Sequence, residues 1–106
     1  MHPFQIGMAA EASEVVLHTN TAAAIASGTL DVYATPAMIG LMEQAACKAI
    51  AACLEDGITT VGVSISISHD SATPVGNTVT ATAVLTGVDD RKLTFNEIAS
   101  DDCGVI

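Results

Sequence analysis

The second half of the chain carries a strict alternation of apolar and small polar residues. It covers positions 61–68, which are followed by His69. A period of two predicts a strand with one face in a core, and His69 falls on the buried parity. The apolar members of this run are Val61, Val63, Ile65 and Ile67.

The middle of the chain is predicted to form one long helix. It should begin at Thr35, a favourable N-cap residue, with Pro36 at the first helical position, and run to about Leu54 before Gly57. Apolar residues cover most of its circumference, which is typical of a helix enclosed by other elements. Strands are expected at 13–19, 78–88 and 92–100, a short helical turn at 20–28, and turns at 89–91 and 101–104.

This order of elements predicts one α+β domain over residues 1–106. A strand, a long helix and then consecutive antiparallel strands allow a curved sheet to wrap around a central helix, as in the hot-dog fold. A further strand should begin after Gly104, and the sequence ends at Ile106. We therefore expect a hot-dog domain that lacks its C-terminal strand.

Composition narrows the possible partners. Twelve acidic residues against three of Lys and Arg give a formal charge of −9, which disfavours nucleic-acid binding because that binding needs many cationic contacts. The sequence shows neither a signal peptide nor a membrane span. Three cysteines without a C-x-x-C pair favour reduced thiols in a cytoplasmic protein over a disulfide framework or a metal site, and no metal is expected; these are Cys47, Cys53 and Cys103.

Three residues combine reactive chemistry with an unusual setting. Thr35 stands at a helix N-terminus, where N–H groups stabilise negative charge, although its hydroxyl could simply cap the helix. Glu43 projects from a largely apolar helix face, where an unpaired charge is costly, although it could lie at the sheet edge. His69 could act as a general base or be a hydrogen-bonded residue at a strand end. Gly62 is either a bend in a strand or a point where a ligand meets the backbone.

Four segments, 27–39, 41–43, 59–62 and 69–76, together resemble the fluoroacetyl-CoA thioesterase family. Their elements A-T-P-A-M-I, L-M-E and H…A-T-P-V-G occur in the same order. The resemblance implies that Thr35, Glu43 and His69 act together on an acyl-CoA thioester and that Gly62 lies close to the acyl group. It also implies a homodimer with active sites near the subunit interface. Residues 22–29 are small where the specialised enzyme has a bulky lid, so selectivity for fluorinated substrates is not expected.

The resulting hypothesis is an acyl-CoA thioesterase that hydrolyses a short-chain acyl-CoA or related thioester. Thr35 would serve as nucleophile or position the water, His69 would be the base, and Glu43 would orient His69 or attack the carbonyl. No cofactor is expected, because coenzyme A is part of the substrate, and the partner is a second copy in a homodimer or higher homo-oligomer. The alternatives are a non-catalytic acyl-CoA binding module, a structural oligomerisation domain, and a hydratase or dehydratase acting on CoA esters.

Overall fold

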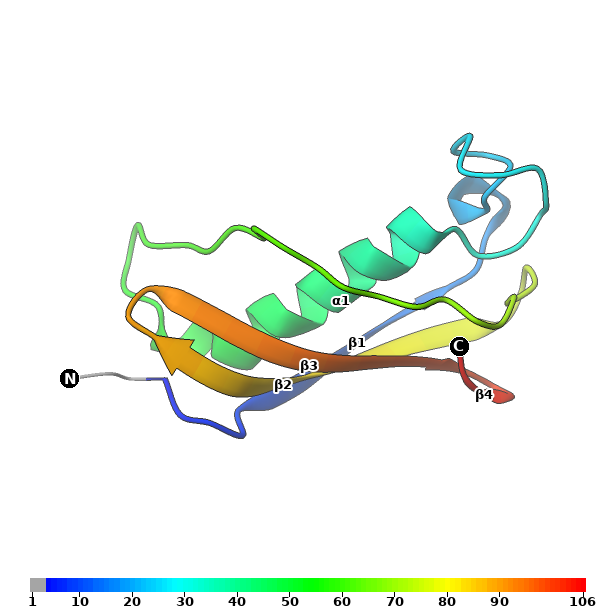
Figure 1. Cartoon of the computed structure of the whole chain (residues 1–106). Coiled ribbons are helices and arrows are strands. Elements are labelled where there is room, and N and C mark those ends of the chain that lie inside the picture. Colours follow the sequence, from blue (N-terminus) through cyan, green and yellow to red (C-terminus); the bar gives the residue numbers. More distant parts are fainter. Residues whose placement is uncertain (1–3) are drawn as a thin grey trace.

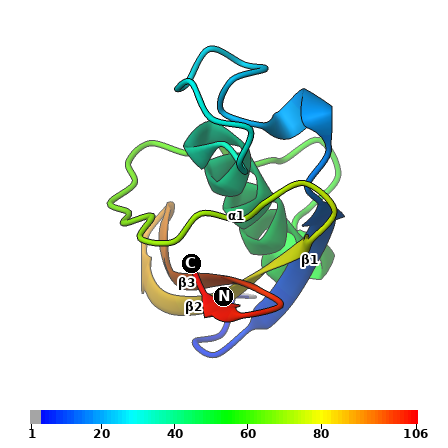
Figure 2. The same ribbon diagram turned by 90° about the vertical axis from the view of Figure 1, so that its right-hand side faces the viewer.

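The computed structural model describes residues 4–106, and in them one long helix lies across an antiparallel sheet. Helix α1 (Thr35–Ile50) packs chiefly against β1 and β2, and Figure 2 shows the sheet curling partly around it. The expected α+β class is therefore confirmed. The sheet order is β1-β2-β3-β4, and its strands are β1 (Ala9–Val15), β2 (Thr78–Asp89), β3 (Lys92–Asp101) and β4 (Gly104–Val105) (Figure 1).

Short turns connect the last three strands, as the sequence predicts. Strands β2 and β3 pair antiparallel from Thr80↔Ser100 to Asp89↔Lys92. The connection is a two-residue turn in which Asp90 adopts a φ of 55°, a left-handed conformation that Asp tolerates better than most residues. The second turn, around Asp102, leads into β4.

The core lies between α1 and the concave face of the sheet. Every second residue of β2 from Val79 to Leu85 is buried, so this part of the strand contributes one continuous apolar row to the core. Small side chains in the sheet allow the helix to approach closely. The core residues are Met38, Leu41, Met42 and Ala45 of α1, Ala12 and Val16, Val79, Ala81 and Ala83 of β2, Ala99 of β3, Tyr33 and Ile106.

Three boundaries differ from the sequence prediction. The first strand begins at Ala9 rather than residue 13, because Ala9 to Val15 all pair with β2. In place of the helical turn predicted at 20–28, a 3₁₀ turn (η1) at His18–Asn20 is followed by hydrogen-bonded turns at residues 22–26. Helix α1 ends at Ile50 and continues as a 3₁₀ turn (η2, Ala51–Cys53), since Leu54 is already extended.

The prediction of a hydrogen-bonded strand at 61–68 is wrong. Within the part of the chain that the structure describes, this segment is extended but pairs with no strand. Figure 1 shows it running beside α1, and a wide cleft lies between it and β3. Consequently Val61, Val63 and Ile65 are 80%, 78% and 51% exposed, whereas Ile67 packs against the core.

The helix is also less enclosed than its apolar pattern predicts. One face is buried on the sheet, while Ile39, Glu43 and Ala46 line the cleft on the other side. Among residues 4–106, no helix is long and apolar enough to cross a membrane.

Candidate functional site

Thr35 begins α1, but its hydroxyl does not cap the helix. The residue in the N-cap position is Ala34, whose side chain has no capping group, and Pro36 follows within the first turn. A hydrogen bond of 2.7 Å instead joins Thr35 Oγ1 to Nδ1 of His69. The capping interpretation of Thr35 is therefore wrong, because the hydroxyl is bound to an imidazole from a distant segment.

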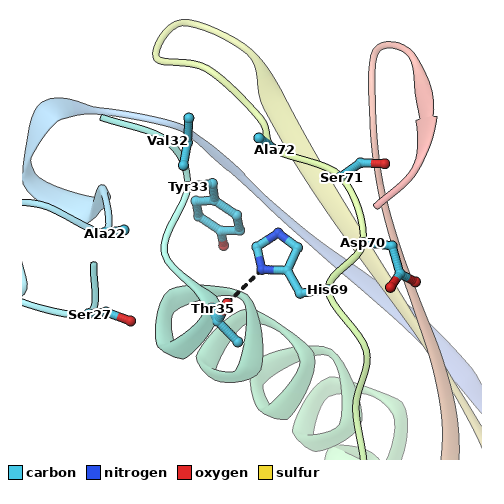
Figure 3. Close-up of a pocket in the computed structure, with 9 residues that line it drawn as sticks. All are labelled: Ala22, Ser27, Val32, Tyr33, Thr35, His69, Asp70, Ser71 and Ala72. Atoms are coloured by element: carbon cyan, nitrogen blue, oxygen red, sulfur yellow. Dashed lines mark hydrogen bonds between the residues drawn. The ribbon is translucent and has the colours of Figure 1, made fainter. Parts of the chain in front are cut away.

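His69 lies in the extended segment that follows residues 61–68, and its ring points toward the first turn of α1 (Figure 3). The side chain is half-buried, in agreement with its predicted inward parity. Its Nε2 atom is buried and has no hydrogen-bond partner among residues 4–106. A buried polar atom without a partner costs about 1–3 kcal/mol, so this nitrogen is suited to a bond with a bound molecule.

Backbone hydrogen bonds hold these two residues together. The N–H of Tyr33 donates to the Thr73 carbonyl at 2.8 Å, which ties the segment before α1 to the loop after His69. The N–H of Asp70 donates to the Ile106 carbonyl at 2.6 Å and anchors the same loop near the sheet. The Thr35–His69 pair thus borders a pocket of about 210 Å³ that Tyr33, Asp70 and Ala72 also line.

Glu43 occupies a neighbouring cleft rather than this pocket. It lies two turns along α1 from Thr35 and is exposed, and it forms no hydrogen bond with Thr35 or His69 in the structure. The cleft has a volume of about 1940 Å³ and is bordered by α1, residues 59–68 and β3. The structure therefore brings Thr35 and His69 together, and it leaves Glu43 on an adjoining surface.

Gly62 lies directly beside the Glu43 carboxylate. A Cβ atom at position 62 would lie 2.7 Å from Glu43 Oε2, closer than Cβ atoms approach other atoms in real structures. The φ of Gly62 is not in the left-handed region, so the requirement is space and not backbone conformation. Gly62 makes room for the Glu43 carboxylate, which is a third role that the two interpretations from sequence did not include.

A second carboxyl group in the cleft, Glu97, was not identified from sequence. It occupies an inward-facing position of β3, and its Oε1 atom is buried without a hydrogen-bond partner among the described residues. Burial raises the pKa of Glu97 to about 7, and the charge of Glu43 adds to the shift. Its parity with Leu93, Phe95 and Ala99 is the signal that could have revealed it.

Three further hydrogen bonds support the loops around the site. The Tyr33 hydroxyl donates to the Glu14 carboxylate, and burial together with this bond raises the Tyr33 pKa above its usual range. The Thr73 hydroxyl donates to Asp101 Oδ2 at 2.7 Å, and the Cys103 N–H donates to Oδ1 at 2.8 Å. The bond from Thr73 is the largest cause that lowers the Asp101 pKa below its usual value.

The hydroxyl and the imidazole of the pocket are groups that can take part in acid–base chemistry. Across residues 4–106, no group of three His, Cys, Asp or Glu side chains could hold a metal ion. A hydroxyl hydrogen-bonded to an imidazole at a helix N-terminus combines a nucleophile or water-positioning group, a base and an electropositive environment.

Comparison with known proteins agrees with these observations. Residues 16–106 match the sequence profile of the family described as fluoroacetyl-CoA-specific thioesterase. The fluoroacetyl-CoA thioesterase of Streptantibioticus cattleyicolor is 45% identical over 71 residues. These residues are 67% of this chain and 51% of that enzyme, so the match spans about half the length of the curated relative.

Solved structures show the same architecture. A mutant of the fluoroacetyl-CoA-specific thioesterase FlK in complex with fluoroacetate and CoA has a TM-score of 0.91 at 34% identity, with 97% of this chain and 87% of that chain covered. A thioesterase superfamily member from Thermus thermophilus has a TM-score of 0.89 at 27% identity, with 100% of this chain and 79% of that chain covered. A hot-dog-like protein from Thermanaerovibrio acidaminovorans shares the fold, with a TM-score of 0.87. The chain is a hot-dog protein and belongs to the fluoroacetyl-CoA-specific thioesterase family.

Proposed function

We propose that this protein hydrolyses a short-chain acyl-CoA or a related thioester. The observation that carries the proposal is the hydrogen bond between Thr35 Oγ1 and His69 Nδ1 at the N-terminus of α1. When the hydroxyl donates, the imidazole is the acceptor, as a general base must be. Thr35 then acts as nucleophile or orients the attacking water, and His69 takes the proton.

The first turn of α1 supplies stabilisation for the oxyanion. The first helical hydrogen bond runs from the Met38 N–H to the Ala34 carbonyl, so the N–H of Ala37 precedes the helical ladder. Together with the positive end of the helix dipole, such a group stabilises a developing negative charge. Glu43 lies in the adjoining cleft, and no hydrogen bond links it to His69. In this proposal it therefore acts on the thioester carbonyl and does not orient His69. Gly62, beside Glu43, borders the acyl group.

Coenzyme A release over an acyl-chain series tests the activity. Thr35→Ala and His69→Ala should each lower kcat by at least about a hundredfold, the usual contribution of a positioned acid–base group. Thr82→Ala and His18→Ala are matched controls, because both side chains are exposed and lie outside the pocket. Turnover at the wild-type rate in both site variants would overturn the proposal.

The same measurements separate the main rival. A non-catalytic binding module would give saturable binding of CoA thioesters without release of thiol.

The proposal includes no cofactor, since coenzyme A enters as part of the substrate, and it places the protein in the cytoplasm. The exposed thiols of Cys47 and Cys103 support a reducing location.

The proposal also includes a homodimer. Residues 61–65 present a row of exposed apolar side chains on an extended backbone without ladder partners. An apolar, unpaired edge of this kind favours association with another chain, and a second copy offers the same edge by two-fold symmetry. Because this segment also borders the cleft of Glu43, pairing there would enclose the cleft.

A further inference from the structure

Glu97 is an acidic residue in a row of apolar side chains on the inner face of β3. On β3 the inward-facing side chains are Leu93, Phe95, Glu97 and Ala99, and Glu97 pairs across the sheet with the buried Ala83. A carboxyl group in this row lies on the α1 side of the sheet and is half-buried in the cleft. Its Oε1 atom is buried and lacks a hydrogen-bond partner within residues 4–106. An ionised carboxylate is costly in such a place, whereas a protonated one also provides a donor.

Glu43 of α1 lines the same cleft as this carboxyl group. Gly62, also in the lining, leaves space for the Glu43 carboxylate beside it. The charge of Glu43 is close enough to contribute to the shift that raises the pKa of Glu97 to about 7, after the larger effect of burial. Two carboxyl groups that interact within one cleft keep a proton between them more readily than two separate ones.

The surrounding charges do not neutralise this pair. Residues 59–68 contain no titratable side chain. Lys48 of α1 donates to the Glu11 carbonyl at 2.7 Å, toward β1. The remaining titratable groups that line the cleft are Cys47 of α1, Asp70 at one end, and Asp89, Asp90, Arg91 and Lys92 at the hairpin end. His69 borders the adjoining pocket and binds Thr35.

We propose that Glu97 is a positioning residue: its protonated carboxyl group donates a hydrogen bond to the Glu43 carboxylate and holds it against Gly62, facing the thioester. This inference rests on the proposed function, which it deepens by adding a residue that acts through Glu43. The pair keeps one proton, and Glu43 carries the charge. When Glu97 ionises, the bond is lost and the two carboxylates repel each other.

The sign of the pH dependence follows from this arrangement. Glu97 must be protonated, so its titration makes the rate fall as the pH rises through about 7. A falling limb near neutral pH is therefore the signature of Glu97.

Kinetics with three variants test this role. In the wild type, kcat should fall above pH 7, and in Glu97→Gln this falling limb should disappear, because an amide donates without titrating. Glu97→Leu should lower kcat at least about tenfold at every pH with little change in KM, and Glu97→Gln should restore part of that loss. Glu11→Gln, an exposed carboxyl of β1, is the matched control and should keep the wild-type profile. Persistence of the falling limb in Glu97→Gln would overturn the proposal.

A titration of side-chain carboxyl ¹³C signals tests the same contact without any turnover. The signal missing from Glu97→Gln identifies Glu97, which should titrate near pH 7 in the wild type and at lower pH in Glu43→Gln. A Glu97 signal that titrates near pH 4, or that does not respond to Glu43→Gln, contradicts the pairing. If no CoA thioester is hydrolysed but the titrations are coupled, the proposed function fails while the pairing is confirmed. If hydrolysis occurs without coupling, only the role of Glu97 fails.

Discussion

The role of Thr35 differs from the one that its position at a helix N-terminus predicts. As a helix N-terminal threonine it is expected to accept a hydrogen bond from its own helix, yet its hydroxyl bonds His69 at 2.7 Å. Ala34 occupies the cap position, and Pro36 removes one of the N–H groups that a cap would satisfy. The hydroxyl therefore serves the site and not the helix.

Gly62→Ala tests the space that Glu43 needs. The added methyl group would come within 2.7 Å of Glu43 Oε2, and the flexible end of that side chain can move away. We expect a change in Tm of less than about 2 °C, since only a surface side chain shifts, but a fall in kcat of about tenfold or more. Thermal melting and the CoA release assay measure the two effects.

Gly40→Ala is the control for this substitution, because a Cβ at that position of α1 meets nothing within 4 Å. It should retain the wild-type kcat. Equal kcat values for Gly62→Ala and the wild type would show that the position of the Glu43 carboxylate does not matter.

At the level of the elements, Tyr33 ties the segment before α1 to its surroundings through two hydrogen bonds. Tyr33 is fully buried, and its hydroxyl donates to Glu14 of β1. Its backbone N–H donates to Thr73. These bonds connect β1, the start of α1 and the loop after His69, so they set where the helix N-terminus lies relative to the imidazole.

Tyr33→Phe should lower the free energy of unfolding by about 1.5–3 kcal/mol, the usual range for a hydrogen bond to a charged group. Urea unfolding followed by circular dichroism measures the loss. In a Glu14→Ala background the same substitution should cost less, because its acceptor is already absent. An equal loss in both backgrounds would mean that the hydroxyl contributes nothing through Glu14.

Asp101 connects the turn before β4 to the loop after His69. Its pKa is held below the usual value chiefly by the Thr73 hydroxyl, with help from the Cys103 N–H. A lowered folded-state pKa adds stability above the unfolded value of about 3.9, and this is lost as the pH falls through the folded-state pKa. The Tm of Asp101→Asn should therefore lie below that of the wild type at pH 7, and the difference should shrink below pH 4.

Thermal melting from pH 7 to pH 3 measures this convergence, and Asp102→Asn serves as the control because Asp102 is exposed in the same turn. A difference in Tm between Asp101→Asn and the wild type that is equally large at pH 3 would contradict the assignment of this group.

For the whole molecule, the exposed edge at residues 61–65 favours association with a second copy of the chain. Val63→Asp places a charge in the middle of this row, where Val63 is 78% exposed in the single chain. If two copies pair along this edge, the variant should sediment as a monomer while the wild type sediments as a dimer. Ile6→Asp, at a comparably exposed site away from the edge, should remain a dimer. A dimer that persists in Val63→Asp would exclude this edge as the interface.

Local chemistry was enough to predict much of the fold. The helix start at Thr35, the strands on either side of the 89–91 turn and the inward parity of His69 follow from periodicity and turn residues, which act over a few positions. Other features depend on partners. The 61–68 segment has the period of a strand, but alternation only determines which face each side chain takes, and a strand also needs a neighbour to bind its backbone.

The residues by themselves determined a helix and a set of antiparallel strands, and they supplied the candidates Thr35, Glu43 and His69. Only the tertiary structure decided which of these meet. The bond between Thr35 and His69 spans 34 positions, and the cleft that Glu97 and Glu43 share depends on how β3 lies relative to α1. Such contacts arise from packing between distant segments, so no local pattern specifies them.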